Sequence, residues 1–249
     1  MGERAGDALE SGAMVLGRDR GPWDLVKRCL VLAPHPDDLD VVAVTLRRLQ
    51  EAGAEVFLEV LTSGASGVED DFADGWEAKT EAREAEQLAS CHLFGLAVER
   101  VRFHRLDEDE EGHMRADESN ESRVRAILDR VDADTVVLPH GCDSNADHRR
   151  TFQFFDAWAR ERGGSTLALL VKDPKTLGMR VDLVTAFSDE EAAWKGGMLR
   201  CHESQQTRNL RSRGYGLDER ILRTNRDIAR EAGLDAGYAE AFEVQEYGR

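Results

Sequence analysis

Short apolar runs alternate along the chain with longer segments in which apolar residues recur every three or four positions. The short runs are typical of buried strands, and the longer segments are typical of helices with one buried face. We expect strands over residues 28–33, 55–62, 98–103, 134–139, 166–171 and 181–187. We expect helices over residues 39–53, 76–94 and 118–131, near 189–204 and 217–232, and in a segment that contains Phe152, Phe155 and Ala159.

Strands that alternate with helices of these lengths predict βαβ units and a mostly parallel sheet. We therefore expect an α/β protein with one domain over residues 26–249, preceded by a leader or irregular lead-in over residues 1–25. We predict no helix or strand in the C-terminal segment "YAEAFEVQEYGR", and we expect it to form an interface, a lid or plain surface.

Two polar loops follow predicted strands. The loop "HPDD" at residues 35–38 follows the first strand, and the loop "HGCDSNADH" at residues 140–148 follows the fourth. In open parallel sheets, ligands bind in the crevice beyond the carboxyl ends of the strands. We therefore expect both loops to contribute to one site at that edge of the sheet.

The residue types in these loops indicate a metal site. His35 and Asp38 are three positions apart in a turn that opens a helix, and the second loop adds Asp147 and His148. Two histidines and one carboxylate, with open positions for water, form a usual catalytic zinc set, and iron(II) accepts the same ligand types. For the first loop alone, the alternative is a capped helix, in which Asp37 or Asp38 accepts backbone N–H bonds.

Composition places the chain among globular proteins. Hydrophobic residues make up 41% of its 249 residues and charged residues 33%, as in soluble domains. No apolar stretch approaches the roughly 20 residues of a membrane span, and the N-terminus lacks the apolar segment of a secretion signal, so we expect a cytoplasmic protein. The four cysteines are far apart and form no C-x-x-C pair, which argues against disulfides and against a thiolate zinc site.

The formal net charge of −16 limits the partners. A field of this sign repels phosphate backbones, and no stripe of Lys and Arg stands out, so we expect no binding to nucleic acid. The densest acidic run, residues 106–122, is expected to be mostly a solvated loop and a helix start.

Two motifs resemble a known family. "APHPDDLD" at residues 33–40 resembles the signature of the LmbE-like (PIG-L) N-deacetylases, and "NADHRRT" at residues 145–151 resembles their second motif. The order and spacing of weaker matches extend the resemblance to about residues 29–209. These matches are "LTSGASG", "REAEQLASCHLFGL" and "KGGMLRCHESQ". The resemblance implies a Rossmann-like three-layer sandwich, one bound zinc ion, and removal of acetyl groups from N-acetylglucosamine-type substrates.

The resemblance also implies roles for individual residues. It makes His35, Asp38 and His148 the metal ligands, and it makes Asp37 the general base. In the family, the residue that matches Asp147 pairs with a histidine two positions earlier that helps to stabilise the oxyanion. Here that position holds Asn145, which can donate one neutral hydrogen bond.

Further departures and matches concern the surroundings of the site. His140 and His202 are the alternative sources of the missing imidazole. Leu39 stands where the family commonly has Glu, which we interpret as repacking of the helix against the sheet.

For substrate binding, the resemblance implies Arg83 and Asp107. The alternatives are an exposed helix residue paired with Glu86 and the first acid of a solvated loop. The segment "RGYGLDER" lacks the G-x-G-x-x-G pattern, so no dinucleotide cofactor is expected.

The leading hypothesis is a zinc-dependent N-deacetylase that acts on a small N-acetylated molecule. A zinc amidase acting on a thiol conjugate or another N-acyl metabolite uses the same ligands. A binding protein without catalytic activity is a third hypothesis, which the asparagine at position 145 favours. A metal phosphoesterase is a further alternative. It needs a second metal ion, and Asp40 and Asp143 are the carboxylates that remain to bind one. The family also includes homo-oligomers, so the resemblance allows one here.

Overall fold

The computed structural model describes residues 13–16 and 25–248. Within these ranges, eight strands form one sheet in the order β1-β7-β8-β6-β5-β2-β3-β4. The strands are β1 (Met14–Leu16), β2 (Arg28–Ala33), β3 (Glu55–Val60), β4 (Val101–Phe103), β5 (Thr135–Pro139), β6 (Thr166–Val171), β7 (Leu183–Phe187) and β8 (Tyr238–Tyr247). Neighbouring strands are parallel except that β8 runs antiparallel to β6 and β7. The predicted α/β fold with a mostly parallel sheet is confirmed.

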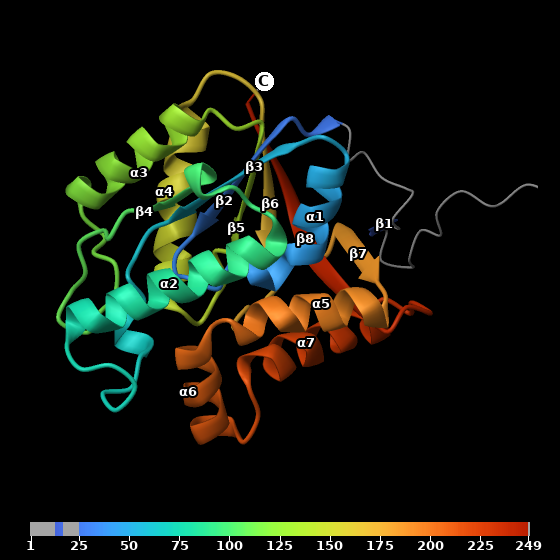
Figure 1. Cartoon of the computed structure of the whole chain (residues 1–249). Coiled ribbons are helices and arrows are strands. Elements are labelled where there is room, and N and C mark those ends of the chain that lie inside the picture. Colours follow the sequence, from blue (N-terminus) through green and yellow to red (C-terminus); the bar gives the residue numbers. More distant parts are fainter. Residues whose placement is uncertain (1–12, 17–24, 249) are drawn as a thin grey trace, which may run out of the picture.

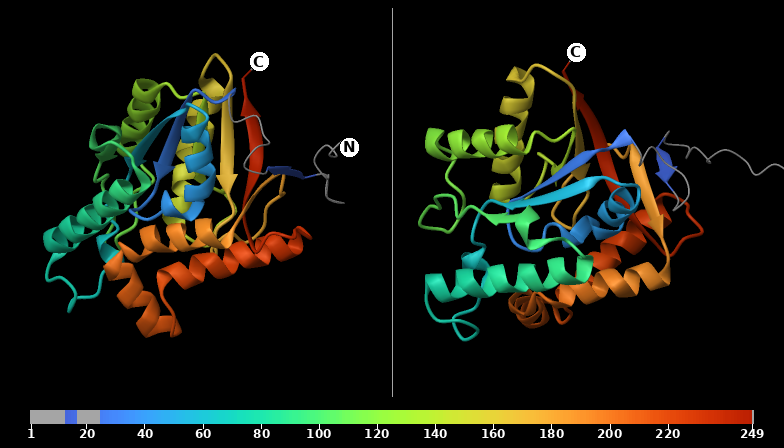
Figure 2. Two further views of the ribbon diagram at one scale, coloured as in Figure 1. Left: turned by 45° about the vertical axis from the view of Figure 1, so that its right-hand side comes forward. Right: turned by 45° about the horizontal axis from the view of Figure 1, so that its top comes forward.

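Helices cover both faces of the sheet (Figures 1 and 2). The α-helices are α1 (Ala43–Glu51), α2 (Trp76–Phe94), α3 (Glu118–Val131), α4 (Ala146–Glu161), α5 (Asp189–Arg200), α6 (Glu203–Arg213) and α7 (Leu217–Glu231). Short 3-10 helices occur at Asp40–Val42, Ala65–Gly67 and Val98–Arg100. None of the helices in the described ranges is long and apolar enough to cross a membrane.

The two-residue period of β2 sorts its side chains between two cores. Leu30 and Leu32 pack with side chains of α3 and α4, whereas Cys29 and Val31 pack with side chains of α1, α2 and α5. Alternate residues of a strand point to opposite faces of the sheet. An almost continuous apolar strand is therefore what a sheet covered on both faces requires.

Several predicted boundaries differ from the structure. The helix expected near 189–204 ends at Arg200, and α6 is a separate helix. The C-terminal segment is not a lid or plain surface, because it forms β8 between β6 and β7. Of the expected leader, residues 1–12 and 17–24 lie outside the described residues, and Met14–Leu16 form β1, which pairs with β7.

A buried ion pair fixes β8 against the helices. Nζ of Lys195 on α5 donates to Oε1 of Glu240 on β8 (2.8 Å) and to Oδ1 of Asn225 on α7 (3.0 Å). The Glu240 carboxylate also accepts hydrogen bonds from the backbone N–H groups of Val44 and Thr45, at 3.1 and 2.8 Å. One carboxylate therefore joins α5, the sheet and the first turn of α1.

The strand order brings the two polar loops together. From β2 the chain continues to β3 and β4 on one side, whereas β5 and β6 lie on the other side of β2. The strand order reverses between β2 and β5, which is where open α/β sheets form their ligand crevice. Residues 34–38 and 140–148, which follow these two strands, open into that crevice.

Candidate metal centre and cavity

The loop after β2 is held in a strained turn. The backbone N–H of His35 donates to Oδ2 of Asp38 at 2.8 Å. Asp37 has a φ of 98°, a conformation that is costly for a residue with a Cβ and that persists only when its surroundings enforce it. Two residues of α2 provide this restraint, because Gln87 accepts a hydrogen bond from the Asp37 N–H (2.7 Å) and Arg83 donates to its Oδ2 (3.0 Å).

The loop after β5 turns directly into α4. Asn145 is the N-cap, and its side-chain oxygen accepts hydrogen bonds from the N–H groups of Asp147 (2.8 Å) and His148 (3.4 Å). Asp143 in turn accepts a hydrogen bond from the Asn145 N–H at 2.7 Å. This capping places Asp147 and His148 in the first helical turn, at the crevice. The predicted catalytic residue Asn145 is thus part of the helix cap, while its side-chain N–H₂ group has no hydrogen-bond partner among the described residues.

Three side chains from the two loops offer ligand atoms to one point. Single ligand atoms of His35, Asp38 and His148 lie within 4.8 Å of one another. Nδ1 of His35 is 3.6 Å from Oδ2 of Asp38, and Nε2 of His148 is 3.6 Å from Oδ1 of Asp38. Ligand atoms of a tetrahedral zinc ion with bonds of about 2.0–2.1 Å are roughly 3.3 Å apart. The spacing therefore fits one such ion with little movement.

In both histidines, the ring nitrogen that faces away from Asp38 forms a hydrogen bond with a carboxylate. Nε2 of His35 lies 2.9 Å from Oδ2 of Asp147, and Nδ1 of His148 lies 3.1 Å from Oδ2 of Asp143. Histidines that bind metals commonly donate their outer N–H to a carboxylate, which fixes the tautomer and orients the ring. Each ring thereby turns its other nitrogen toward Asp38, which is the orientation that a metal ligand needs.

The charges at this centre reinforce the pairing. Burial favours the neutral form of His35, but hydrogen bonds with Asp147 and Asp38 outweigh it and raise the pKa of His35 to about 9. Burial would raise the pKa of Asp147, but the hydrogen bond with His35 outweighs this effect and lowers the pKa of Asp147 to about 2. Asp147 is therefore an ionised acceptor at neutral pH.

Two residues at this centre were not expected from the sequence. Nδ1 of His113 lies 3.3 Å from Oδ2 of Asp147, and Nζ of Lys175 lies 3.4 Å from Nε2 of His148. His113 belongs to the acidic loop, where a single histidine gives no periodic signal. Lys175 lies in residues 172–176, which follow β6. Because ligands bind beyond the carboxyl ends of parallel strands, this position could have indicated a third loop of the site.

Arg83 is almost completely buried, with a relative exposure of 2%. The alternative of an exposed helix residue is wrong, although the ion pair with Glu86 is present, with Nη1 and Oε2 3.5 Å apart. Arg83 also donates to the Pro36 carbonyl oxygen and lines a cavity of about 160 Å³ together with Asp37. Gly64 approaches Arg83 closely with a φ of +63°, so a side chain there would be strained and crowded.

Asp107 does not reach this cavity. Its side chain is 58% exposed and lies 3.8 Å from Arg123. It lines a separate hollow together with Trp76 and Arg105. The structure therefore brings Arg83, but not Asp107, to the candidate centre.

The alternative histidines have other partners. Nε2 of His202 lies 3.2 Å from Oδ2 of Asp40, and both side chains are fully buried. Nε2 of His140 lies 3.4 Å from Oε2 of Glu243 on β8. Neither histidine replaces the imidazole missing at Asn145. Asp40 is already paired with His202, so it is not available to bind a second metal ion.

Comparison with known proteins now decides the family. Residues 30–159 match the family model described as "PIG-L: GlcNAc-PI de-N-acetylase". The chain belongs to the PIG-L/LmbE-like deacetylase family. Diacetylchitobiose deacetylase of Thermococcus kodakarensis is 31% identical over 87 residues, which are 34% of this chain and 31% of that protein. The match therefore spans about a third of the length of this relative.

Known structures show that this PIG-L family member shares its fold with enzymes of different activity. N,N'-diacetylchitobiose deacetylase from Pyrococcus horikoshii superposes with a TM-score of 0.74 at 19% identity, covering 90% of this chain and 85% of its own. A deacetylase of the teicoplanin biosynthetic pathway gives 0.70 at 17% identity, covering 88% and 98%. The 4-carboxy-2-hydroxymuconate hydratase of Pseudomonas putida gives 0.67 at 19% identity, covering 88% and 95%. The fold alone therefore does not determine the reaction.

Proposed function

We propose that this chain is a zinc-dependent N-deacetylase that hydrolyses the N-acetyl group of a small, N-acetylglucosamine-type substrate. One arrangement supports the proposal most. His35, Asp38 and His148 face one point, and the outer nitrogens of both imidazoles bond to carboxylates, as in metal sites. Three protein ligands leave a position for water, which distinguishes catalytic zinc sites from structural ones.

Asp37 is the proposed general base. When bound, zinc supplies Lewis-acid chemistry, since it lowers the pKa of water to about 7 and polarises a carbonyl oxygen. Oδ2 of Asp37 accepts a hydrogen bond from Arg83, and Oδ1 has no hydrogen-bond partner among the described residues. Oδ1 accepts the proton of the attacking water and then transfers it to the departing amine nitrogen. Water and the amide thus give a carboxylate and an amine.

The restraints on Asp37 support this assignment. Its φ of 98° and its contacts with Gln87 and Arg83 fix the carboxylate one residue before the proposed ligand Asp38. A base held in position lowers the entropic cost of reaching the transition state. Asn145 lines the same cavity as Asp37, and its side-chain N–H₂ group, which has no partner among the described residues, can donate to the developing oxyanion.

The names of the relatives support the proposed substrate class. The family description names GlcNAc-PI, and two relatives are named as diacetylchitobiose deacetylases. Both names denote molecules that contain N-acetylglucosamine. A zinc amidase acting on another N-acyl metabolite would use the same ligands, so the assay needs a panel of acylated amines.

The first experiment measures metal content and acetate release together. We expect about one zinc or iron ion per chain in the wild type and in His92→Ala, an exposed histidine of α2 that serves as a control. We expect His148→Ala to lose both the ion and turnover. Asp37→Asn should keep the ion and lose turnover. Acetate release by Asp37→Asn at the wild-type rate would refute the role of the base, and metal-loaded protein inactive on the whole panel would favour a binding protein.

A further inference from the structure

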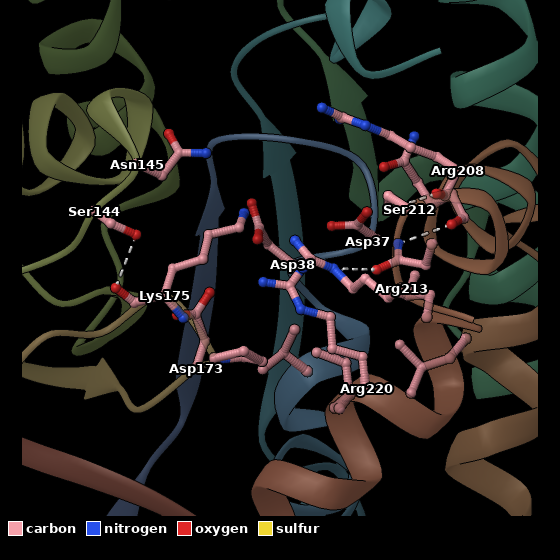
Figure 3. Close-up of a pocket in the computed structure, with 17 residues that line it drawn as sticks. Asp37, Asp38, Ser144, Asn145, Asp173, Lys175, Arg208, Ser212, Arg213 and Arg220 are labelled. Carbon is pink, nitrogen blue, oxygen red and sulfur yellow. Dashed lines mark hydrogen bonds between the residues drawn. The ribbon is translucent and has the colours of Figure 1, made fainter. Parts of the chain in front are cut away.

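A second cavity adjoins the candidate metal centre and has a different chemical character. It has a volume of about 470 Å³, and Asp37 and Asp38 form one side of it. Arg208 and Arg213 of α6 and Arg220 of α7 form another side (Figure 3). In Figure 3, Arg213 and Arg220 extend toward the part of the cavity that also holds Asp38 and Lys175. The cavity therefore joins the proposed reaction centre to a group of guanidinium ions.

These three arginines are not paired with carboxylates. Within the described part of the chain, no Asp or Glu oxygen lies within 4.0 Å of their side-chain nitrogens. Among the described residues, Asn209 is their one side-chain hydrogen-bond partner, and its Oδ1 accepts from Nε of Arg213 at 3.2 Å. In contrast, Arg211 on the same α6 forms a bidentate pair with Asp71, with both distances 2.7 Å.

The lack of pairing is notable in a chain with 49 acidic and 33 basic residues. Burial and the neighbouring charge of Arg213 lower the pKa of Arg220, and the charges of Asp173 and Asp37 offset this effect only in part. Like charges crowded in a cavity repel one another unless an anion lies between them. Guanidinium groups bind phosphate and carboxylate through parallel N–H···O bonds. Lys175 and the three arginines line the cavity together with Asp37, Asp38 and Asp173, so its positive charge is concentrated at the arginines of α6 and α7.

We propose that Arg208, Arg213 and Arg220 bind an anionic group, a phosphate or a carboxylate, on the same substrate whose N-acetyl group faces the metal centre. The inference rests on the proposed function, because that proposal is what places the N-acetyl group of the substrate at the metal centre. The three arginines lie beyond residues 30–159, the segment that matches the family model. The proposed anion-binding side chains therefore belong to α6 and α7, outside that segment.

The test measures binding, so that it does not depend on turnover. Full-length Asp37→Asn protein would be titrated by calorimetry with N-acetylglucosamine, its 1-phosphate and 6-phosphate, and N-acetylmuramic acid. We expect at least one anionic sugar to bind more than tenfold more tightly than N-acetylglucosamine. The phosphate arms and the carboxylate arm show which anion the site accepts. The same ligands would then be tested on Arg213→Gln and Arg220→Gln in this background, with Arg211→Gln as the control from α6.

We expect each cavity variant to weaken binding of the anionic sugar about 10- to 100-fold, the range for a charge-assisted hydrogen bond, and to leave metal content unchanged. Arg211→Gln should have no effect. Equal affinity for neutral and anionic sugars, or tight anion binding that is unaffected by Arg213→Gln and Arg220→Gln, would overturn the inference. The second result would mean that the anion binds the metal alone. If the protein binds the anionic sugar but hydrolyses no amide, the inferred anion site would be supported and the proposed deacetylase function would be refuted.

Discussion

Oδ2 of Asp147 lies 2.9 Å from Nε2 of His35, although the two residues are 112 positions apart in the chain. The same oxygen lies 3.3 Å from Nδ1 of His113. One carboxylate thus orients a proposed metal ligand and holds a second imidazole at the cavity. The pair explains why two short loops from different strands act as one unit.

His113 holds the second imidazole that pairs with Asp147 at this cavity, and we propose that it stabilises the oxyanion that develops on the amide carbonyl. We expect His113→Ala to lower kcat about a hundredfold, because removal of one group that stabilises an oxyanion costs a factor of this order, while KM changes little. Steady-state kinetics on the best substrate of the panel would measure both values. Metal content should stay at the wild-type level, which separates this effect from loss of the ion. A wild-type kcat in His113→Ala would show that the residue only anchors the acidic loop.

Asp143 should control metal affinity through His148. Its Oδ2 accepts from Nδ1 of His148 at 3.1 Å, and loss of such an outer carboxylate typically weakens metal binding 10- to 100-fold. We therefore expect Asp143→Asn to bind zinc at least tenfold more weakly in a competition titration against a chromophoric chelator. Asp74→Asn, which alters an exposed acid, is the matched control. Equal zinc affinity in all three proteins would contradict the assigned orientation of His148.

Lys195 and Glu240 should dominate the stability of the C-terminal half. Both side chains are buried, and their charged groups are 2.8 Å apart. Removal of one partner from a buried pair costs about 3–5 kcal/mol, so Lys195→Met should lower the free energy of unfolding in urea by that amount. Lys172→Met, which breaks the more exposed pair with Glu231, should cost at most about 1 kcal/mol. The double variant Lys195→Met/Glu240→Gln should recover part of the loss, because no buried charge is left unpaired.

Glu108 should make stability depend on pH. Burial raises its pKa, hydrogen bonds from Ser63 lower it in part, and its buried Oε2 has no partner among the described residues. Because the folded state binds this proton more tightly than the unfolded chain, the group destabilises the fold as pH rises through its folded pKa. Glu108→Gln should therefore increase the free energy of unfolding by about 1 kcal/mol at pH 8, and the gain should vanish by about pH 3.5, below the ordinary glutamate pKa of about 4.3. Urea unfolding at both pH values would measure it. Glu110→Gln, an exposed neighbour, should show no gain at either pH.

Local patterns predicted most of the secondary structure. The helix over 76–94 and the strands over 28–33 and 166–171 have the predicted boundaries, because apolar periodicity and a following Gly or Pro are read within a few residues. The strand β8 was missed. Its place between β6 and β7 depends on pairing with segments more than fifty residues away along the chain.

The sequence by itself determined the family, the fold class and the two loops that contain His35, Asp37, Asp38 and His148. These features follow from short motifs and from the rule that parallel strands end at a common edge. Only the tertiary structure decided which side chains complete the centre, since it brought in His113, Lys175 and the arginines of α6 and α7 and excluded Asp107. No local sequence pattern marks these residues. They come together only because helices pack and loops run in ways that depend on contacts between side chains far apart in the chain.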